Sequence, residues 1–279
     1  SILSCSICAI RYLSTKSGFP VWKYISSVSA LSADIPTPMM VMIEGGKHSD
    51  YDGVKWQEYL LNSEDINDGK VFLNKLKNQF VENSISYQVG TEGGYNADLQ
   101  TDEQALEFFL NVLGSSGNRN SFSVDIAASH GVDLDIENIM SMSRDNIISI
   151  EDPAGEEEWN KWCEINKSYG SKLKIIGDDL TTTNADRLKK AIKLGACNGV
   201  IIKPNQIGSV SETLEFAKLA KANNLTCIVS HRAQETDDDF ISDLAVGIGA
   251  DYLKSGAPTQ SQRLAKYIRL DDIKKEFGK

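Results

Sequence analysis

Six short apolar runs recur along the chain after residue 120, and each run ends on a charged residue or a histidine. The runs are rich in β-branched residues, are too short for buried helices, and end at intervals of about 25 residues. We therefore predict six buried parallel strands, separated by amphipathic helices such as 184–194 and 209–222. The residues on which the runs end are Asp125, Glu151, Asp178, Lys203, His231 and Lys254.

Two more strands are predicted before these six. Residues 39–44 form another apolar run, which ends on Glu44, and residues 54–61 predict a more irregular strand that carries Gln57 and Glu58. Eight strands that alternate with helices close into an α/β barrel, whose chemistry lies at the carboxyl ends of its strands. We therefore expect the charged run endings to share one site.

Residues 1–36 do not follow this strand and helix period. They predict two helices joined by a turn at Gly18 and Pro20. We interpret this segment as a linker or a remnant of a neighbouring domain, and we assign residues 37–279 to the barrel.

Composition limits the class of protein. A chain of 279 residues, of which 41% are hydrophobic and 24% charged, is long enough to bury a full core. Its net charge of −10 argues against nucleic acid or an anionic membrane as a partner. No apolar run approaches the roughly 20 residues of a membrane span. The odd number of cysteines, five, indicates reduced thiols, so we expect a cytoplasmic protein.

Three consecutive predicted strands end on a carboxylate, namely Asp125, Glu151 and Asp178. Because neighbouring strand ends converge at the mouth of a barrel, these carboxylates can meet at one point. Hard oxygen ligands without histidine or cysteine suit Mg²⁺ better than zinc. The alternative is that each acid caps the helix that follows, but three acids in phase favour a magnesium site.

Basic residues end three other strands. We place Lys203 and Lys254 across the ring from the carboxylates, where a nearby divalent cation would push a lysine toward its neutral form and make it a general base. His231 and Arg232 form a natural clamp for a phosphate or a carboxylate, since arginine offers a planar fork of donors.

Glu58 and Glu92 lie on early glycine-rich segments, where they could face Lys203 across the cavity. Mutual repulsion would raise the pKa of one carboxyl group and make it an acid. His48 follows a pair of glycines that lets the backbone approach a ligand, whereas His130 has no assigned role. Metal carboxylates, a lysine base and an acidic pair together indicate removal of a proton beside a carboxylate, followed by loss of a leaving group.

Longer strings around these residues resemble the enolase family over essentially the whole chain. The strings are Gly-Gly-Lys-His48, Gln57-Glu58, Glu92-Gly-Gly, Ser-Ile-Glu151-Asp-Pro, Gly-Asp178-Asp-Leu-Thr-Thr-Thr-Asn, Ile-Lys203-Pro-Asn-Gln-Ile-Gly, Val-Ser-His231-Arg-Ala-Gln-Glu-Thr, Lys254-Ser-Gly-Ala-Pro and Arg263-Leu-Ala-Lys-Tyr-Ile-Arg-Leu. The resemblance implies an enolase-type TIM barrel of order ββαα(βα)6. It also implies Mg²⁺-dependent dehydration of 2-phospho-D-glycerate to phosphoenolpyruvate in glycolysis.

The resemblance further implies a role for each site residue. Lys203 would remove the proton at C2, while Glu92 and Glu58 help the 3-hydroxyl group to leave as water, with His48 on the leaving-group side. The residues implied to bind substrate are His231, Arg232, Lys254 and Gln57, and those implied to bind Mg²⁺ are Asp125, Glu151 and Asp178.

The chain also departs from the family pattern. Thr91 stands where the family has Asp before Glu92, and Ala233-Gln234 replaces the usual Ser-Gly. Family members carry an amino-terminal capping domain, of which residues 1–36 are the expected remnant, so the 279 residues alone are expected to be far slower than an intact enzyme. The alternative function is a catalytically weak structural subunit. Besides a phosphorylated carboxylic acid, the expected partner is a second copy of the chain or a larger assembly.

Overall fold

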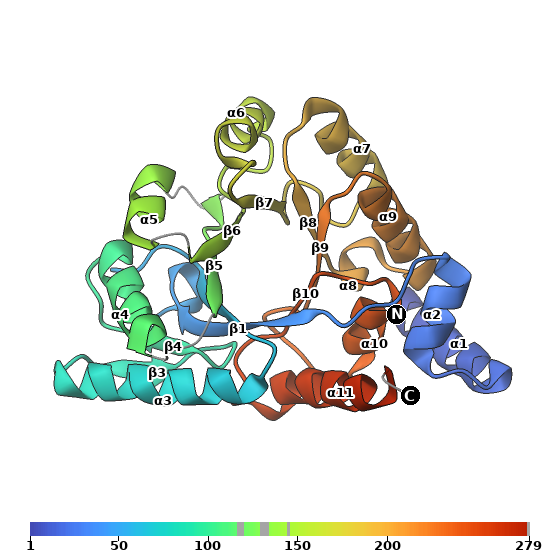
Figure 1. Ribbon diagram of the computed structural model, residues 1–279, viewed down its shortest axis with the longest axis horizontal. Helices are drawn as coiled ribbons and strands as arrows, with labels where there is room; N and C mark the ends of the chain where they lie inside the picture. Colours follow the sequence, from blue (N-terminus) through green and yellow to red (C-terminus); the bar gives the residue numbers. More distant parts are fainter. Residues whose placement is uncertain (116–119, 129–133, 144–145, 278–279) are drawn as a thin grey trace.

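The computed structural model describes residues 1–115, 120–128, 134–143 and 146–277. A closed ring of eight strands lies at its centre, with helices arranged around it (Figure 1). The strands in ring order are β1 (Thr37–Glu44), β2 (Glu58–Asn62), β5 (Ser121–Asp125), β6 (Ile147–Glu151), β7 (Lys174–Gly177), β8 (Gly199–Ile202), β9 (Thr226–Ser230) and β10 (Tyr252–Lys254). The predicted α/β barrel is confirmed, while His130 lies outside the described residues.

The order of elements is ββαα(βα)6, because β2 follows β1 directly and runs antiparallel to both β1 and β5. The other neighbouring pairs in the ring are parallel, and the pairing of β1 with β10 closes it. The second strand begins at Glu58, four residues later than the sequence predicted, and Gln57 lies just before it. This reversal brings the start of β2 to the end of the barrel where the other strands finish.

Helices follow the strands and cover the outside of the barrel. They are α3 (Ile66–Glu82), α4 (Asp102–Ser115), α5 (Ile136–Ser143), α6 (Trp159–Tyr169), α7 (Ala185–Leu194), α8 (Pro204–Ile207), α9 (Val210–Ala222), α10 (Phe240–Gly247) and α11 (Ser261–Phe277). Asn184 and Ser209, the first residues of two predicted helical stretches, cap α7 and α9 with their side chains. A hairpin of β3 (Tyr87–Val89) and β4 (Tyr95–Ala97) and a short turn, η1 (Gly46–His48), complete the early part.

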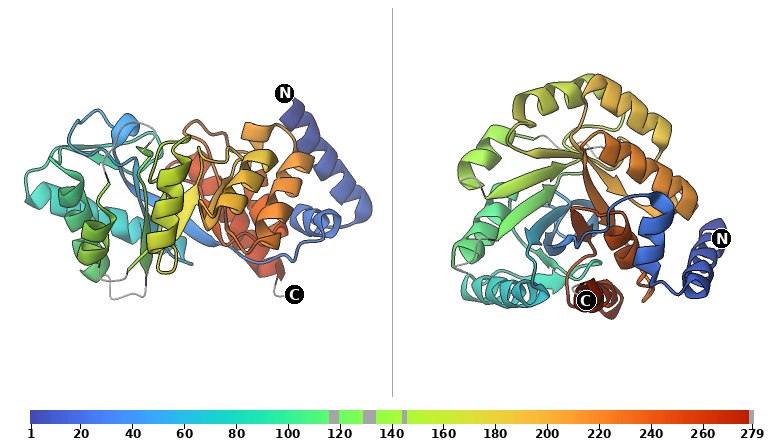
Figure 2. Two further views of the ribbon diagram at one scale, coloured as in Figure 1. Left: turned by 90° about the horizontal axis from the view of Figure 1, so that it is seen from above. Right: turned by 45° about the vertical axis from the view of Figure 1, so that its right-hand side comes forward.

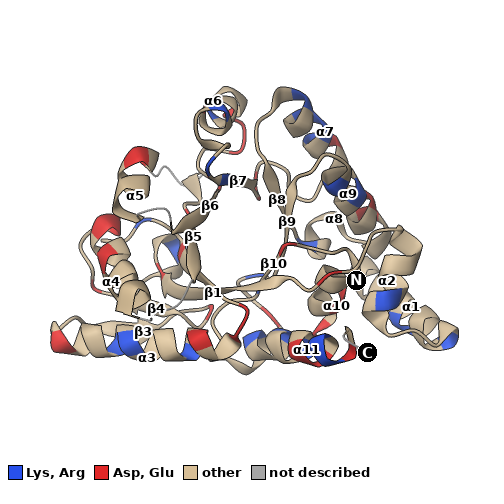
Figure 3. Cartoon of the chain, viewed as in Figure 1, with Lys and Arg blue, Asp and Glu red and all other residues tan. Residues whose placement is uncertain are grey.

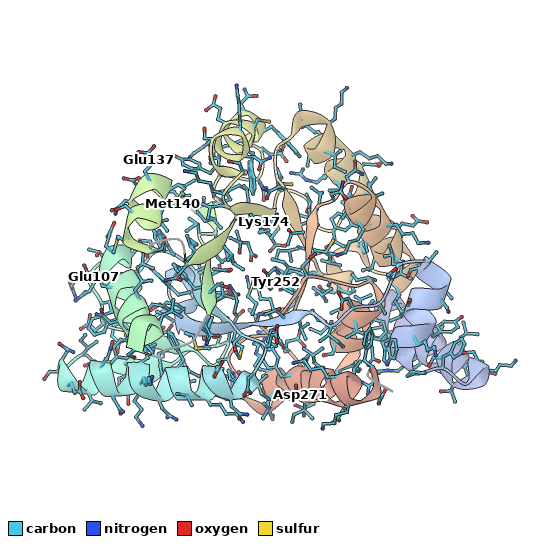
Figure 4. The ribbon with its side chains drawn as sticks, viewed as in Figure 1. Glu107, Glu137, Met140, Lys174, Tyr252 and Asp271 are labelled. Atoms are coloured by element: carbon cyan, nitrogen blue, oxygen red, sulfur yellow. The ribbon has the colours of Figure 1, made fainter. Side chains whose placement is uncertain are left out.

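Two apolar cores hold the barrel together. A small cluster fills the inside of the ring, and a much larger one lies between the strands and the helices. The inner cluster consists of Met39, Val41, Leu60, Ile176, Ile201 and Ile228. Charged residues lie along the outer faces of the helices (Figure 3), and Glu107 and Glu137 point away from the barrel (Figure 4). Because an apolar cluster covers each face of the strands, the strands appear in the sequence as continuous apolar runs.

The first two helices, α1 (Ile2–Ser17) and α2 (Val21–Ser29), lie together beside the barrel, next to α9 and α10 (Figure 2). Arg11 on α1 pairs with Asp238 at 2.8 Å, and the Asp243 carboxylate accepts the Trp22 amide at 3.1 Å. Several apolar side chains on these helices are exposed, including Ile2 at 78% and Tyr12 at 65%. No helix in the described ranges has both the length and the apolar character that a membrane span requires.

The aromatic part of the outer core gives a test of packing. Phe109 on α4 is fully buried, and its ring centroid lies 4.7 Å from that of Phe72 and 5.3 Å from that of Phe122. We expect Phe109→Ala to lower the free energy of unfolding by about 3 to 5 kcal/mol, because it leaves a cavity between α3, α4 and β5. Val71→Ala, at a half-exposed position on α3, should change it by less than about 0.5 kcal/mol. Equal denaturant midpoints for the two variants would contradict this account.

Candidate active site

Four carboxylates lie in one row across the mouth of the barrel. Glu44 is paired in register with Glu58, Glu58 with Asp125, and Asp125 with Glu151, so the row crosses four adjacent strands. All four residues are at most 4% exposed. Buried like charges at this spacing repel one another, so the row requires a positive charge nearby.

Lys254 supplies that positive charge. Its Nζ lies 2.8 Å from Glu58 Oε2, 3.0 Å from Asp125 Oδ2 and 2.8 Å from Glu151 Oε2. Burial alone would lower the pKa of Lys254, but the surrounding carboxylates outweigh it and hold that pKa well above its ordinary value. Burial raises the pKa of Glu151 as well, and the Asp125 charge adds to the shift. Since β10 lies opposite β6 in the ring, the prediction that Lys254 faces the carboxylates is confirmed.

Lys203 follows β8 and forms an ion pair with Asp178 Oδ2. The prediction that Lys203 lies across the ring was wrong, because β8 is the direct neighbour of β7, which Asp178 follows. Burial alone would raise the pKa of Asp178, but the Lys203 ammonium lowers it. Burial would lower the pKa of Lys203, but Asp178 and Glu151 raise it, so the protein groups alone keep this lysine protonated. Gln206 also donates to Asp178 Oδ1, at 3.1 Å.

Asp152 binds the backbone that carries Asp178. Its carboxylate accepts the amides of Asp178 at 2.9 Å and Asp179 at 3.0 Å. Its side chain is buried, because a left-handed backbone with φ of 45° ends the regular alternation of strand β6. Asp152 therefore has a structural contact with the site that the strand pattern did not reveal.

A second cluster lies on the early, irregular side of the barrel. Glu92, in the loop between β3 and β4, is 2% exposed, and its carboxylate lies 3.5 Å from His231 Nε2 and 3.9 Å from His48 Nδ1. Burial raises the pKa of Glu92. Burial and the Glu92 charge hold the pKa of Glu58 well above its ordinary value. Burial thus favours the protonated form of both carboxyl groups.

Arg263 on α11 orients His231. Its guanidinium contacts His231 Nδ1 and donates to the carbonyl oxygens of Arg232 at 2.6 Å and Ala233 at 2.7 Å. Because arginine can only donate, Nδ1 must accept and the imidazole proton lies on Nε2, toward Glu92. Burial and the Arg263 charge hold the pKa of His231 well below its ordinary value, which keeps the ring neutral. Sequence reasoning gave Arg263 no role, although it lies in one of the matching strings.

The two remaining predicted residues lie at the edge of these clusters. Gln57 donates from Nε2 to Asp125 Oδ2 at 3.4 Å. Arg232 is exposed and donates to Asn205 Oδ1 at 3.2 Å, beside a cavity of about 430 Å³ that Arg11 also lines. Arg232 is thus the most open cationic group among the predicted site residues.

The carboxylates at the mouth have the chemistry of a metal site. Glu151 Oε1 is buried and has no hydrogen-bond partner among the described residues, as expected of an oxygen that can accept a cation. Among the described residues, oxygen and nitrogen atoms of types that could hold a metal lie within 4.8 Å of one another in two groups, Asp152, Asp178 and Asp179, and His48, Glu58 and Glu92. The predicted trio of Asp125, Glu151 and Asp178 is not one of these groups; Lys254 contacts Asp125 and Glu151, and Lys203 contacts Asp178. The residues fit a divalent cation by donor type.

Comparison with known proteins agrees with the fold. The chain matches the family described as "Enolase, C-terminal TIM barrel domain" over residues 32–138 and 133–279. An enolase of Bifidobacterium animalis subsp. lactis is 35% identical over 306 residues, which cover 100% of this chain and 70% of that protein. An enolase of Natranaerobius thermophilus is 35% identical over 305 residues, covering 99% of this chain and 71% of that protein. The chain belongs to the enolase family.

The buried carboxyl group of Glu44 makes stability depend on pH. Burial raises its pKa to about 7, against an ordinary value of 4.5, so the folded state binds this proton more tightly than the unfolded state. The contribution is therefore fully present below about pH 4.5 and is lost as the pH rises through about 7. Glu44→Gln has no carboxyl group to titrate at this position, so the parent should lose stability relative to it as the pH rises. We expect the unfolding free energy of Glu44→Gln minus that of the parent to increase by about 2 to 3 kcal/mol from pH 5 to pH 8. Parallel stability curves for the two proteins would refute this.

Proposed function

We propose that this barrel carries the active site of an enolase-type lyase, which dehydrates 2-phospho-D-glycerate to phosphoenolpyruvate with Mg²⁺ in glycolysis. The observation that carries the proposal is the meeting, at one barrel end, of the Lys203 and Asp178 pair with two buried carboxyl groups whose pKa values are raised. A reaction that removes a proton from one carbon and a hydroxyl group from the next needs both of these parts.

Lys203 is the proposed base for the proton at C2. The Lys203 side chain is only 14% exposed and forms an ion pair with Asp178, so its position is fixed before substrate binds. Its ion pair favours the ammonium form, and a divalent cation that takes over the Asp178 charge would lower the pKa of Lys203 toward the neutral base.

Glu92 and Glu58 are the proposed acids on the side of the leaving hydroxyl group. Their raised pKa values allow one of them to donate a proton near neutral pH. His48 lies within 3.9 Å of Glu92 and, because burial lowers its pKa, serves as a neutral hydrogen-bonding group at the same place.

Charged groups around the mouth provide the proposed substrate contacts. Arg232 is open to a phosphate, and His231 presents its Nε2 proton on the inner side. Lys254 and Gln57 now donate to carboxylates of the protein. A substrate carboxylate would take the place of some of these acceptors.

Asp125, Glu151 and Asp178 are the proposed Mg²⁺ ligands. When bound, the cation would stabilise the negative charge that develops as the proton leaves C2. These three carboxylates would then give up their present contacts with Lys203 and Lys254, and both amines would be free to contact substrate.

The proposal extends to organisation and setting. We assign residues 1–36 to the remnant of a capping domain and 37–279 to the barrel, since α1 and α2 lie beside the ring of strands and contribute no strand to it. We also propose a cytoplasmic location and a homodimer or larger assembly. A second candidate function is a catalytically weak structural subunit, which the exposed apolar side chains of α1 and α2 favour. Ala233, which follows Arg232, also favours it, because alanine has no side-chain hydrogen-bond donor.

Metal binding can be tested by calorimetry. We expect Mg²⁺ to bind the parent protein, and Asp178→Asn to weaken binding by at least tenfold, about 1.4 kcal/mol, because it removes one charged ligand. Asp186→Asn, which alters an exposed acid on α7, is the matched control. Identical heats for the parent and Asp178→Asn would contradict the proposed ligand set.

The base can be tested by kinetics in the complete natural polypeptide. We expect Lys203→Ala to lower the rate of phosphoenolpyruvate formation, followed by absorbance, by about 10² to 10⁴ or more. Lys189→Ala, at an exposed position on α7, should leave the rate unchanged. A Lys203→Ala protein that folds normally and retains the parent rate would show that the base lies elsewhere.

A further inference from the structure

Glu44 has no role in the proposed reaction, yet its surroundings are specific. It is the last residue of β1 and is 1% exposed. The amide of Glu92 donates to both of its oxygens, at 3.1 and 3.0 Å, and the amide of Gly94 donates to Oε1 at 2.7 Å. The hydroxyl of Thr91 donates to Oε2 at 3.3 Å. Three residues of one loop therefore converge on this carboxylate.

The loop is also shaped around the carboxylate. A Cβ atom placed on Gly90 would lie 2.5 Å from Glu44 Cδ and Oε2, and one placed on Gly94 would lie 3.2 Å from Oε1. Any side chain at Gly90 would displace the Glu44 carboxylate, so glycine provides the space. The backbone of the loop and Glu44 thus form one unit with Glu92 at its centre.

We propose that Glu44 is a positioning residue for Glu92: it holds the loop that carries this acid, and its carboxylate acts on the acid through its charge. The inference rests on the proposed function, in which Glu92 donates a proton. Above about pH 7, where Glu44 is ionised, its carboxylate disfavours a second negative charge on Glu92 and so favours the protonated form of that acid. The Thr91 hydroxyl lies 3.3 Å from Glu44 Oε2, so a carboxylate at position 91 would carry its charge close to that of Glu44.

The other charged groups around Glu92 act in both directions. The hydrogen bond from Glu58 and the charges of Lys254 and Arg263 favour its ionised form, whereas the Glu44 charge opposes it. Burial raises the pKa of Glu92 and the Glu44 charge raises it further. Glu44 thus offsets the two cations, which would otherwise leave a smaller fraction of Glu92 protonated and able to donate.

A purely structural role for Glu44 is the alternative, and charge separates the two. Glu44→Gln keeps the side-chain volume and one acceptor oxygen but removes the charge. Adding Thr91→Asp returns a carboxylate to the same place from the loop side. Glu82→Gln, which removes an exposed charge on α3, is the matched control.

The experiment measures kcat and KM in the complete polypeptide, together with the pKa of the Glu92 carboxyl carbon by ¹³C NMR. We expect Glu44→Gln to lower the pKa of Glu92 by about one unit and kcat about tenfold with little change in KM. Glu44→Gln with Thr91→Asp should restore the Glu92 pKa and bring kcat back to within about threefold of the parent value. If Glu44→Gln alone does not fold, recovery of folding and of both readouts by the double variant is the expected result.

An unchanged Glu92 pKa in Glu44→Gln overturns the inference, whether or not kcat falls, because the residue is then only a loop anchor. Failure of the double variant to recover overturns it as well. If the parent does not dehydrate 2-phosphoglycerate but the Glu92 pKa still follows the Glu44 charge, the proposed function fails while the electrostatic contact stands.

Discussion

The burial of one ammonium group among three carboxylates is the interaction on which the rest of the barrel mouth depends. Lys254 comes from β10, whereas Glu58, Asp125 and Glu151 come from β2, β5 and β6, so the contact spans the ring. None of these charges is tolerable alone in a buried setting, since an unpaired buried charge costs several kcal/mol. The closure of the barrel and the compensation of its charges are therefore one requirement.

The buried charges at the barrel mouth lower the stability of the protein, but they give the site its ionisable groups. Apolar residues of similar volume would pack the mouth at lower cost, and the inner core just below it is wholly apolar. The raised pKa values of Glu44, Glu58 and Glu92 show the same strain, because each reflects a charge that burial disfavours. Such groups are useful where protons must move near neutral pH, which explains why they gather at one end of the molecule.

The irregular start of the barrel has a physical role in this arrangement. Because β2 runs antiparallel, its first residue, Glu58, lies level with the last residues of β1 and β5. The β3 and β4 hairpin then brings Glu92 over the same edge, where the end of β1 holds its loop. The regular half of the ring carries Asp178 and Lys203, and the irregular half carries the raised carboxyl groups. The two halves thus supply different chemistry to one site.

The sequence by itself determined the barrel, because apolar runs of strand length and capped amphipathic helices are local patterns that survive without knowledge of the fold. It also indicated Asp178, Lys203 and Lys254, since residues that end strands must reach the mouth. Only the tertiary structure decided which groups pair: Lys203 contacts its neighbour Asp178, whereas Lys254 reaches across the ring. Glu44 was visible as the end of an apolar run, but its role was not, because its bonds go to a loop 48 residues later. Such long-range contacts depend on strand order and burial, which no local pattern encodes.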